Sequence, residues 1–317
     1  MSRNLNLNAA ARAQKDEFYT LRADIERELR HYQKLFAGQT VLCNCDDPDR
    51  SEFVKYFAQN FQSLGLKKLI ATCRADSTAP ARLTEFSSPD DFKVTTLDGD
   101  GDFRSPECLD ALKEADVVVT NPPFSLFRQF VKLLVDADKK FLIIGNINCI
   151  TYKEIFPLIA ANKVWLGCGM GRAISGFRVP DDYELYGSEA RLDGAGNRIV
   201  ATNQCLWLTN LPLDKRNRPL VLTRSYKDNP ELFPRYDNYD AINVDKTADI
   251  PADYEGVMGV PITFLGKYCP AQFEILGHTA GNDLSPAVEA LRTDPVNRNR
   301  GIIGGRQKYD RILIRRR

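Results

Sequence analysis

Residues 116–124 read Asp-Val-Val-Val-Thr-Asn-Pro-Pro-Phe, and this run decides how the rest of the chain is interpreted. A short apolar strand, Val117 to Thr120, leads into Asn121-Pro122-Pro123-Phe124. Two consecutive prolines cannot continue a strand, so they form a stiff turn that holds the Asn121 amide and nearby carbonyls at the mouth of a sheet. The Phe124 ring follows at once. Rigid acceptors beside a stacking surface suit a planar amino group such as N6 of adenine, and the structural alternative is an ordinary strand-to-helix turn.

The composition restricts the class of protein. A chain of 317 residues suggests one large domain or two, and 43% hydrophobic and 27% charged residues are typical of a soluble globular protein. No apolar run has the length of a membrane span, and the first residues lack the apolar core of a signal peptide. We therefore expect a cytoplasmic protein without a membrane partner, whose eight cysteines are reduced.

The cysteines and histidines do not predict a metal site. There is no Cys-x-x-Cys motif, and the two histidines are His31 and His278. Cys43 and Cys45 lie two apart on an expected strand, and no Pro-Cys dipeptide marks a covalent cysteine mechanism. We expect neither a metal nor a cysteine nucleophile.

The C-terminal segment is basic although the formal net charge is only +1. Its last 27 residues carry nine basic side chains against Asp294 and Asp310. Such a tail suits phosphate binding, and the alternative is a solvated, partly disordered terminus. The alternating pattern from Tyr309 to Ile314 indicates some strand order.

Strands and helices alternate through the first half of the chain, which predicts a doubly wound, mostly parallel α/β sheet. The expected strands cover residues 40–45, 68–73, 93–97, 116–120, 141–145 and 163–167. The expected helices cover residues 16–36, 51–64, 106–114, 126–136 and 153–161. Residues 74–91 are expected to form a loop.

The pattern changes beyond about residue 167, where glycines, prolines and short β-like runs replace the alternation. The later β-like runs cover residues 204–208, 219–223, 257–265, 273–276, 301–305 and 309–314. We expect an irregular α+β region here, with residues 1–210 forming one domain and residues 211–317 a second.

Four motifs fall at or near the carboxyl ends of the expected strands, where open α/β sheets bind ligands. They are residues 16–20 (Asp-Glu-Phe-Tyr-Thr), 44–48 (Asn-Cys-Asp-Asp-Pro), 99–103 (Gly-Asp-Gly-Asp-Phe) and 121–124. Asp46 or Asp47 suits an ammonium group, and Asp102 suits an exocyclic amino group with Phe103 on its ring. A helix cap and an Asp-Gly turn are the structural alternatives.

The sequence resembles the S-adenosylmethionine-dependent amino-group DNA methyltransferases, and most closely the EcoRI-type adenine-specific enzymes. The resemblance extends from about residue 15 to 315 through the four motifs, residues 65–73 and Gly259-Val260-Pro261-Ile262-Thr263-Phe264-Leu265. It implies a seven-stranded methyltransferase sheet, with catalysis in residues 1–210 and target recognition in residues 211–317. It also implies double-stranded DNA as substrate, within a restriction–modification pair or alone, and a cognate endonuclease as a functional but not stably bound partner.

The resemblance also implies roles for individual residues. Phe18, Tyr19 and Thr20 would help hold the methionine part of the cofactor, Asp46 or Asp47 its amino group, and Asp102 and Phe103 its adenine. Asn121 and Pro122 would accept hydrogen bonds from the N6 amino group of a flipped base, with Pro123 stiffening the turn and Phe124 stacking on the base. Phe177 and Trp207 are candidates for its other face, and Arg178 is among the arginines expected near DNA.

The chain also departs from the methyltransferase pattern. The expected Gly-x-Gly after the first strand is replaced by residues 47–51 (Asp-Pro-Asp-Arg-Ser), and no acidic residue follows the second strand, leaving Asp76 as a substitute ribose ligand. Two alternatives stay open: methyl transfer to cytosine N4, an RNA base or a protein glutamine, and a non-catalytic DNA-binding relative.

Overall fold

The structure, a computed structural model, describes residues 18–75, 79–170, 173–180, 190–202, 204–279, 285–294 and 300–317. The chain divides into two compact units. The first comprises Met1–Ile150 and Val164–Pro212, and the second comprises Thr151–Lys163 and Leu213–Arg317. Each unit has its own sheet, so the two are described separately. Within the described ranges, no helix has the length and apolar character needed to cross a membrane.

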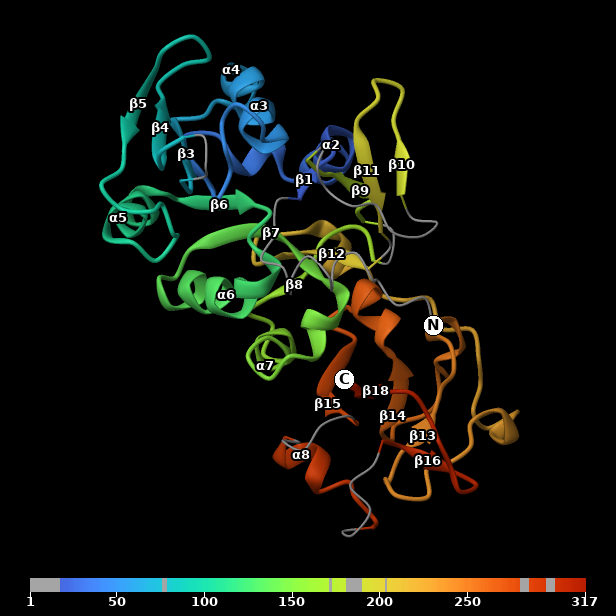
Figure 1. Ribbon diagram of the computed structural model, residues 1–317. Helices are drawn as coiled ribbons and strands as arrows, with labels where there is room; N and C mark the ends of the chain where they lie inside the picture. Colours follow the sequence, from blue (N-terminus) through green and yellow to red (C-terminus); the bar gives the residue numbers. More distant parts are fainter. Residues whose placement is uncertain are drawn as a thin grey trace. The chain divides into compact units, whose positions relative to one another are not determined.

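A sheet of eight strands, ordered β5-β4-β3-β2-β6-β7-β12-β8, forms the centre of the first unit (Figure 1). Its strands are β2 (Thr40–Asn44), β3 (Lys68–Cys73), β4 (Arg82–Phe86), β5 (Phe92–Thr96), β6 (Val117–Thr120), β7 (Lys140–Asn146), β8 (Trp165–Leu166) and β12 (Cys205–Thr209). The four central strands, β3, β2, β6 and β7, are parallel. Only β4 and β12 run against this direction, so the sheet is mostly parallel, as expected.

The sheet has eight strands, whereas seven were expected. The additional strand is β4, which lies within residues 74–91, the stretch that we expected to form a loop. Only Thr84 and Phe86 of this strand are buried, while Arg82, Leu83 and Glu85 are partly exposed. A short, polar strand of this kind gives no strong periodic signal. Its pairing with β3 is long-range information that the local sequence does not carry.

The strand order reverses beside β2, because the chain passes from β2 to β3 on one side and later to β6 on the other. Right-handed crossovers then place α3 (Glu52–Gln59) and α4 (Phe61–Leu64) on one face, and α5 (Pro106–Glu114) and α6 (Phe127–Asp136) on the opposite face. β2 and β6 are buried along their whole length, and β3 and β7 are buried except at their ends, which explains the continuous apolar runs. Such a reversal is where doubly wound sheets bind ligands.

Helix boundaries in this unit follow local capping signals. The Ser51 hydroxyl accepts from the Phe53 amide at the start of α3, and the Ser105 hydroxyl accepts from the Cys108 amide at the start of α5. Gly65 ends α4 with φ of 64°, a left-handed conformation that favours glycine. The helix expected over residues 51–64 is divided in two, because α3 ends at Gln59 and Asn60 separates it from α4.

The N-terminal segment differs from the expected continuous helix over residues 16–36. Tyr19–Thr20 form strand β1, followed by α2 (Arg22–Leu29) and a 3-10 turn at Gln33–Leu35. β1 pairs with β9 (Gly176–Arg178), and β11 (Arg198–Ala201) and β10 (Ala190–Leu192) complete a four-stranded sheet. The helical spacing of the apolar residues therefore gave a wrong prediction near Phe18. Pairing with β9, about 158 residues further along the chain, holds Tyr19 and Thr20 in an extended strand.

The second unit contains a four-stranded sheet ordered β13-β14-β18-β15. Its elements are α7 (Phe156–Ala160), β13 (Ile242–Asn243), β14 (Met258–Pro261), β15 (Phe273–His278), α8 (Pro286–Glu289), β16 (Ile302–Ile303), β17 (Arg306–Gln307) and β18 (Arg311–Arg316). The basic C-terminal segment is not a disordered tail, because β18 is an inner strand. Arg311 is 7% exposed and binds Asp245, and Arg315 pairs with Glu274. Several tail arginines therefore stabilise the unit itself.

Candidate functional site

The four predicted motifs meet at one cavity of about 710 Å³ in the first unit. This volume lies in the usual range for a cavity that holds a small organic ligand. The motif residues that line it are Phe18, Tyr19, Cys45, Asp46, Asp47, Asp100, Asp102, Asn121 and Pro123. Asp46 follows β2 and Asn121 follows β6, so the cavity lies where the strand order reverses. Asp16, Glu17 and Asp76 lie outside the described residues.

Asn121 has one satisfied and one unsatisfied end. Its Nδ2 donates to the main-chain carbonyl of Phe18 at 2.8 Å. Its Oδ1 is buried and has no hydrogen-bond partner in the described part of the chain. A buried acceptor without a donor costs free energy, and such an atom beside a cavity suits a ligand N–H group. Pro122 is buried, and Pro123 precedes a 3-10 turn (Phe124–Leu126) that begins with the half-buried Phe124.

Asp46 is a buried carboxyl, 8% exposed, without a cationic partner among the described residues. Burial raises its pKa from 3.8 to about 7, while hydrogen bonds from Ser51 and Thr120 act in the opposite direction and Asp47 adds a small further rise. Ser51 Oγ lies 2.6 Å from Asp46 Oδ1, and Thr120 Oγ1 lies 2.6 Å from Asp46 Oδ2. A cation that binds beside Asp46 would therefore stabilise the ionised carboxylate and lower its raised pKa.

Asp47 is already neutralised. Its Oδ1 lies 2.8 Å from Arg82 Nη2, and its Oδ2 lies 3.8 Å from Arg50 Nε. The same Oδ1 accepts from the Asp49 amide at 3.0 Å in a local turn, and the cap of the following helix is Ser51 rather than Asp47 or Asp49. Asp47 therefore combines a turn-forming role with a position on the cavity wall.

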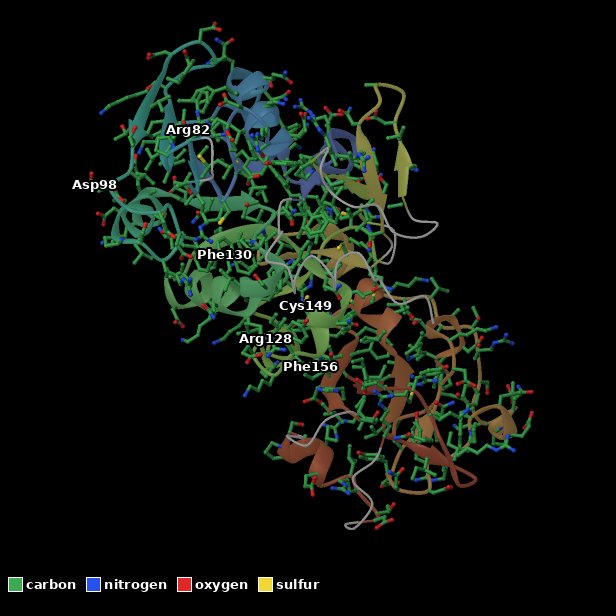
Figure 2. All side chains as sticks on the ribbon, in the orientation of Figure 1. Arg82, Asp98, Arg128, Phe130, Cys149 and Phe156 are labelled. Carbon is green, nitrogen blue, oxygen red and sulfur yellow. The ribbon has the colours of Figure 1, made fainter. Side chains whose placement is uncertain are left out.

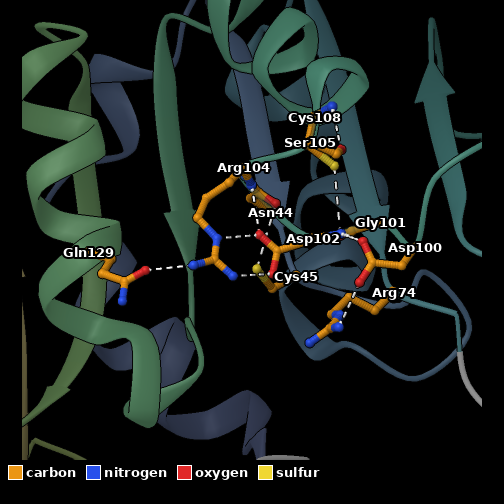
Figure 3. A network of polar contacts seen from close by, with 10 residues as sticks. All are labelled: Asn44, Cys45, Arg74, Asp100, Gly101, Asp102, Arg104, Ser105, Cys108 and Gln129. Carbon is orange, nitrogen blue, oxygen red and sulfur yellow. Dashed lines mark hydrogen bonds and ion pairs between the residues drawn. The ribbon is translucent and has the colours of Figure 1, made fainter.

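Asp102 also has a partner. Both of its oxygens accept from the Arg104 guanidinium, at 2.7 Å from Nε and 2.8 Å from Nη2 (Figure 3). This hydrogen bonding holds the pKa of Asp102 below its usual range. Arg104 Nη1 in turn donates to Gln129 of α6 at 2.7 Å. A ligand amino group that reaches Asp102 must share its oxygens with Arg104.

The neighbours of Asp102 fix the loop. Gly101 has φ of 75°, and a Cβ there would lie 2.4 Å from the Cys73 carbonyl, so the close approach requires glycine. The Phe103 ring is 1% exposed and packs edge-to-face on Phe130, which Figure 2 labels, with the ring centres 5.0 Å apart. Phe103 is not among the residues that line the cavity.

Three aromatic rings form a cluster at the turn formed by residues 121–124. The centres of Phe18, Phe124 and Phe177 lie 5.6 to 5.9 Å apart, and each pair meets edge-to-face. Phe177 is fully buried and its plane is inclined by 72° to that of Phe124. A base sandwiched between two rings needs parallel faces about 7 Å apart, which these rings do not offer. Trp207, the other candidate, is buried in β12 against Phe53.

β1 connects this cavity to the small sheet. Strand pairing relates Tyr19, which lines the cavity, to two arginines. Tyr19 of β1 pairs with Arg178 of β9. Ile199 of β11 pairs with Arg178 on one side and with Arg191 of β10 on the other. Directly paired residues share a face, so this face carries the exposed Arg178 and Arg191 beside a cavity residue. Thr20 lies on the opposite face with Phe177; it is 3% exposed, and its hydroxyl lacks a hydrogen-bond partner in the described ranges.

The sequence prediction missed three arginines on the cavity wall, Arg50, Arg74 and Arg104. Arg74 pairs with Asp100 at 2.7 Å, and Arg50 Nη1 lies 3.4 Å from the Tyr19 hydroxyl. Arg50 and Arg104 stand within two residues of a predicted motif, and Arg74 directly follows the strand expected over residues 68–73; these positions were the available signal. Within the described ranges, no cluster of histidine, cysteine, aspartate or glutamate could hold a metal ion.

Comparisons with known proteins agree on one family. The family model described as adenine-specific methyltransferase EcoRI matches residues 6–89 and 75–317. The chain is 50% identical to the Type II methyltransferase M.EcoRI of Escherichia coli, over 99% of this chain and 98% of that protein. It is 38% identical to M.MgeORF184P of Mycoplasma genitalium and 35% identical to M.MpnI of Mycoplasma pneumoniae, both named Type II methyltransferases, over 98% of each chain. No solved structure matches the chain. The chain therefore belongs to the EcoRI family of adenine-specific methyltransferases.

Proposed function

We propose that this enzyme transfers a methyl group from S-adenosylmethionine to N6 of an adenine flipped out of duplex DNA. The observation that carries the proposal is the buried Asn121 Oδ1, which has no hydrogen-bond donor in the described part of the chain and belongs to a residue that lines the cavity. Three relatives are named Type II methyltransferases, which supports a restriction–modification setting. We further propose a cytoplasmic location and a cognate endonuclease as functional partner. On this proposal, residues 1–210 catalyse and residues 211–317 recognise the target.

The donor set of the cavity suits S-adenosylmethionine. This cofactor carries an ammonium, a carboxylate and an adenine amino group, and the cavity offers both carboxylates and guanidinium groups. Asp46 would hold the ammonium, because Asp47 is already paired with Arg82. Arg50 and Arg74 also line the cavity, and either would bind the carboxylate while sharing its guanidinium group with a protein partner. When bound, the cofactor supplies an electrophilic methyl group on its sulfonium.

Asn121 and Pro122 would orient the target nitrogen. The lone pair of an adenine amino group is delocalised into the ring, so the free amine is a poor nucleophile. Two acceptors, Asn121 Oδ1 and the Pro122 carbonyl, would favour a pyramidal nitrogen and stabilise the positive charge that develops on it. Pro123 stiffens the turn, and the half-exposed Phe124 would stack on the extruded base.

Arg178 would contact the DNA backbone rather than the base. It is exposed and shares a face with Tyr19 of the cavity and with Arg191. Adjacent strands lie about 4.8 Å apart, so the two arginines stand about 10 Å apart on this face. Guanidinium groups at such a spacing suit successive phosphates beside an extruded base.

Asn121→Ala tests the proposed chemistry. We expect the variant to bind S-adenosylmethionine with nearly wild-type affinity in calorimetry and to lose at least about 100-fold in methylation rate. Asn60→Ala is the matched control, because Asn60 Nδ2 also donates to a main-chain carbonyl at 2.8 Å but is not part of the cavity wall. Nucleosides from methylated genomic DNA should contain N6-methyladenine. N4-methylcytosine instead, or a fully active Asn121→Ala enzyme, would refute the proposal.

A further inference from the structure

The orientation of the Asn121 amide is fixed by the N-terminal segment. Nδ2 of Asn121 lies 2.8 Å from the Phe18 carbonyl oxygen, which can only accept. If the amide were rotated by half a turn, two oxygen atoms would face each other at this distance. The hydrogen bond therefore decides that the oxygen, and not the nitrogen, is the end of this cavity-lining residue that has no partner among the described residues.

Phe18 is itself held by two independent contacts. The residue after it, Tyr19, pairs with Arg178, so the main chain is tied to β9. Its ring packs edge-to-face on Phe177 and on Phe124, with ring centres 5.6 and 5.9 Å apart. Because Phe177 is fully buried and contacts both other rings, its removal would loosen the carbonyl and the stacking ring together.

We propose that the Phe18 carbonyl is a positioning group that locks the Asn121 amide with its oxygen toward the target amine, and that Phe177 holds this lock in place. This inference rests on the methyl transfer proposed above. It gives Phe177 a role other than stacking on the base. It also makes a neutral amide necessary at position 121, since this residue must donate to one partner while accepting from another.

The Asn121→Asp variant distinguishes an orienting role of the Phe18 carbonyl from a simple requirement for a hydrogen-bond acceptor at position 121. An ionised carboxylate keeps the acceptor but directs a negative oxygen at the Phe18 carbonyl, so the side chain should turn away. A protonated carboxyl restores the donor and leaves one oxygen free. We therefore expect the activity of this variant, relative to wild type, to be about 100-fold reduced near pH 8 and to rise at least about tenfold as the pH falls toward 5.5.

The wild-type enzyme provides the reference for this pH profile, because it contains every other group that faces the cavity. Those titratable or charged groups are Tyr19, Cys45, Asp46, Asp47, Arg50, Cys73, Arg74, Asp100, Asp102 and Arg104. Taking the ratio of variant to wild-type rate at each pH removes their shared contribution. Asn121→Ala should show a low ratio at every pH, since it has no group to protonate.

Phe177→Leu tests the second half of the inference. We expect kcat to fall about tenfold or more, while the affinities for S-adenosylmethionine and for DNA change less than about twofold. Phe53→Leu is the matched control, since Phe53 is 1% exposed, meets Trp207 edge-to-face at 5.9 Å and is not part of the cavity wall. Both variants lose a comparable core contact, but only the first should lose turnover.

The outcomes distinguish this inference from the proposed function. If Asn121→Asp matches wild type near pH 8, or if Phe177→Leu and Phe53→Leu lose turnover equally, the lock is refuted while methyl transfer stands. If the wild-type enzyme forms no N6-methyladenine on genomic DNA that lacks adenine methylation, both proposals are overturned.

Discussion

The buried carboxyl of Asp46 should make folding stability and cofactor affinity respond to pH in opposite directions. Burial raises the pKa of this carboxyl from 3.8 to about 7. Hydrogen bonds from the Ser51 and Thr120 hydroxyls limit this rise. The single hydroxyl proton of Thr120 is shared between Asp46 Oδ2 and the Asn44 carbonyl.

The sign of the effect follows from the two pKa values. Below about pH 4 the carboxyl is protonated in both states, and this contribution to stability is fully present. Between about pH 4 and 7 the unfolded chain releases the proton while the folded protein keeps it, so the free energy of unfolding falls. A pKa difference of roughly three units corresponds to about 4 kcal/mol, which is lost once the pH has risen through the folded value.

Asp46→Asn should abolish this dependence, since an amide resembles the protonated carboxyl. Denaturant unfolding at several pH values would measure it. Between about pH 5 and 8, the variant should gain on the order of 3 kcal/mol over wild type. Asp102→Asn is the control, because the pKa of Asp102 is shifted in the opposite direction to that of Asp46. The pKa of Asp102 is lowered, so its contribution is lost only as the pH falls through that low value, and its difference from wild type should be flat in this window.

Cofactor binding should show the complementary effect. An ammonium beside Asp46 favours the ionised carboxyl, so the affinity for S-adenosylmethionine should rise with pH up to about 7. Binding near pH 6 should release close to one proton, measured as a calorimetric enthalpy that depends on the ionisation enthalpy of the buffer. Asp46→Asn should release none and bind more weakly. Parallel stability curves for wild type and Asp46→Asn from about pH 5 to 8 would refute the reasoning.

Two further substitutions test other parts of the chain. Arg178→Gln should weaken DNA binding without changing cofactor affinity, and it should reduce by about one the slope of the logarithm of the DNA-binding constant against the logarithm of the salt concentration. Lys93→Gln, a control on the exposed strand β5, should leave that slope unchanged. Equal slopes for Arg178→Gln and wild type would contradict a phosphate contact. Arg311→Met should lower the free energy of unfolding by about 1 kcal/mol, because it removes the hydrogen bonds of a buried guanidinium to Asn243 and to the largely exposed Asp245. An unchanged or higher stability in denaturant unfolding would show that these hydrogen bonds are dispensable.

Local patterns predicted the parts of the fold that depend on local chemistry. The four buried parallel strands appear as apolar runs, and Ser51, Ser105 and Gly65 mark helix boundaries through the hydrogen bonds and the left-handed turn that they form. The strand expected over 204–208 also forms, but as β12 inside the central sheet. Its apolar run showed that it was buried, and no local signal could show which sheet it joins.

The candidate site depended more on distant pairing. The carboxyl ends of parallel strands meet at one edge, so the convergence of Asp46 and Asn121 could be anticipated from the strand pattern. The extended conformation of Phe18 could not, because it results from pairing with β9 and from the Asn121 hydrogen bond. The partners of Asp102 were likewise hidden, since any arginine nearby in sequence could have been turned toward solvent.

Three of the four carboxylates on the cavity wall, Asp46, Asp47 and Asp102, have different partners, which suit them to different tasks. Asp102 is bound in a fork by Arg104, which lowers its pKa and keeps it an acceptor with a fixed direction. Asp47 is paired with Arg82, so a further cation gains little from it. Asp46 is contacted by hydroxyl groups, and its raised pKa means that a cation would gain most there. Carboxyls whose pKa values are driven apart by their surroundings commonly divide a reaction between them. The sequence left the ammonium to either Asp46 or Asp47, and this division of partners favours Asp46.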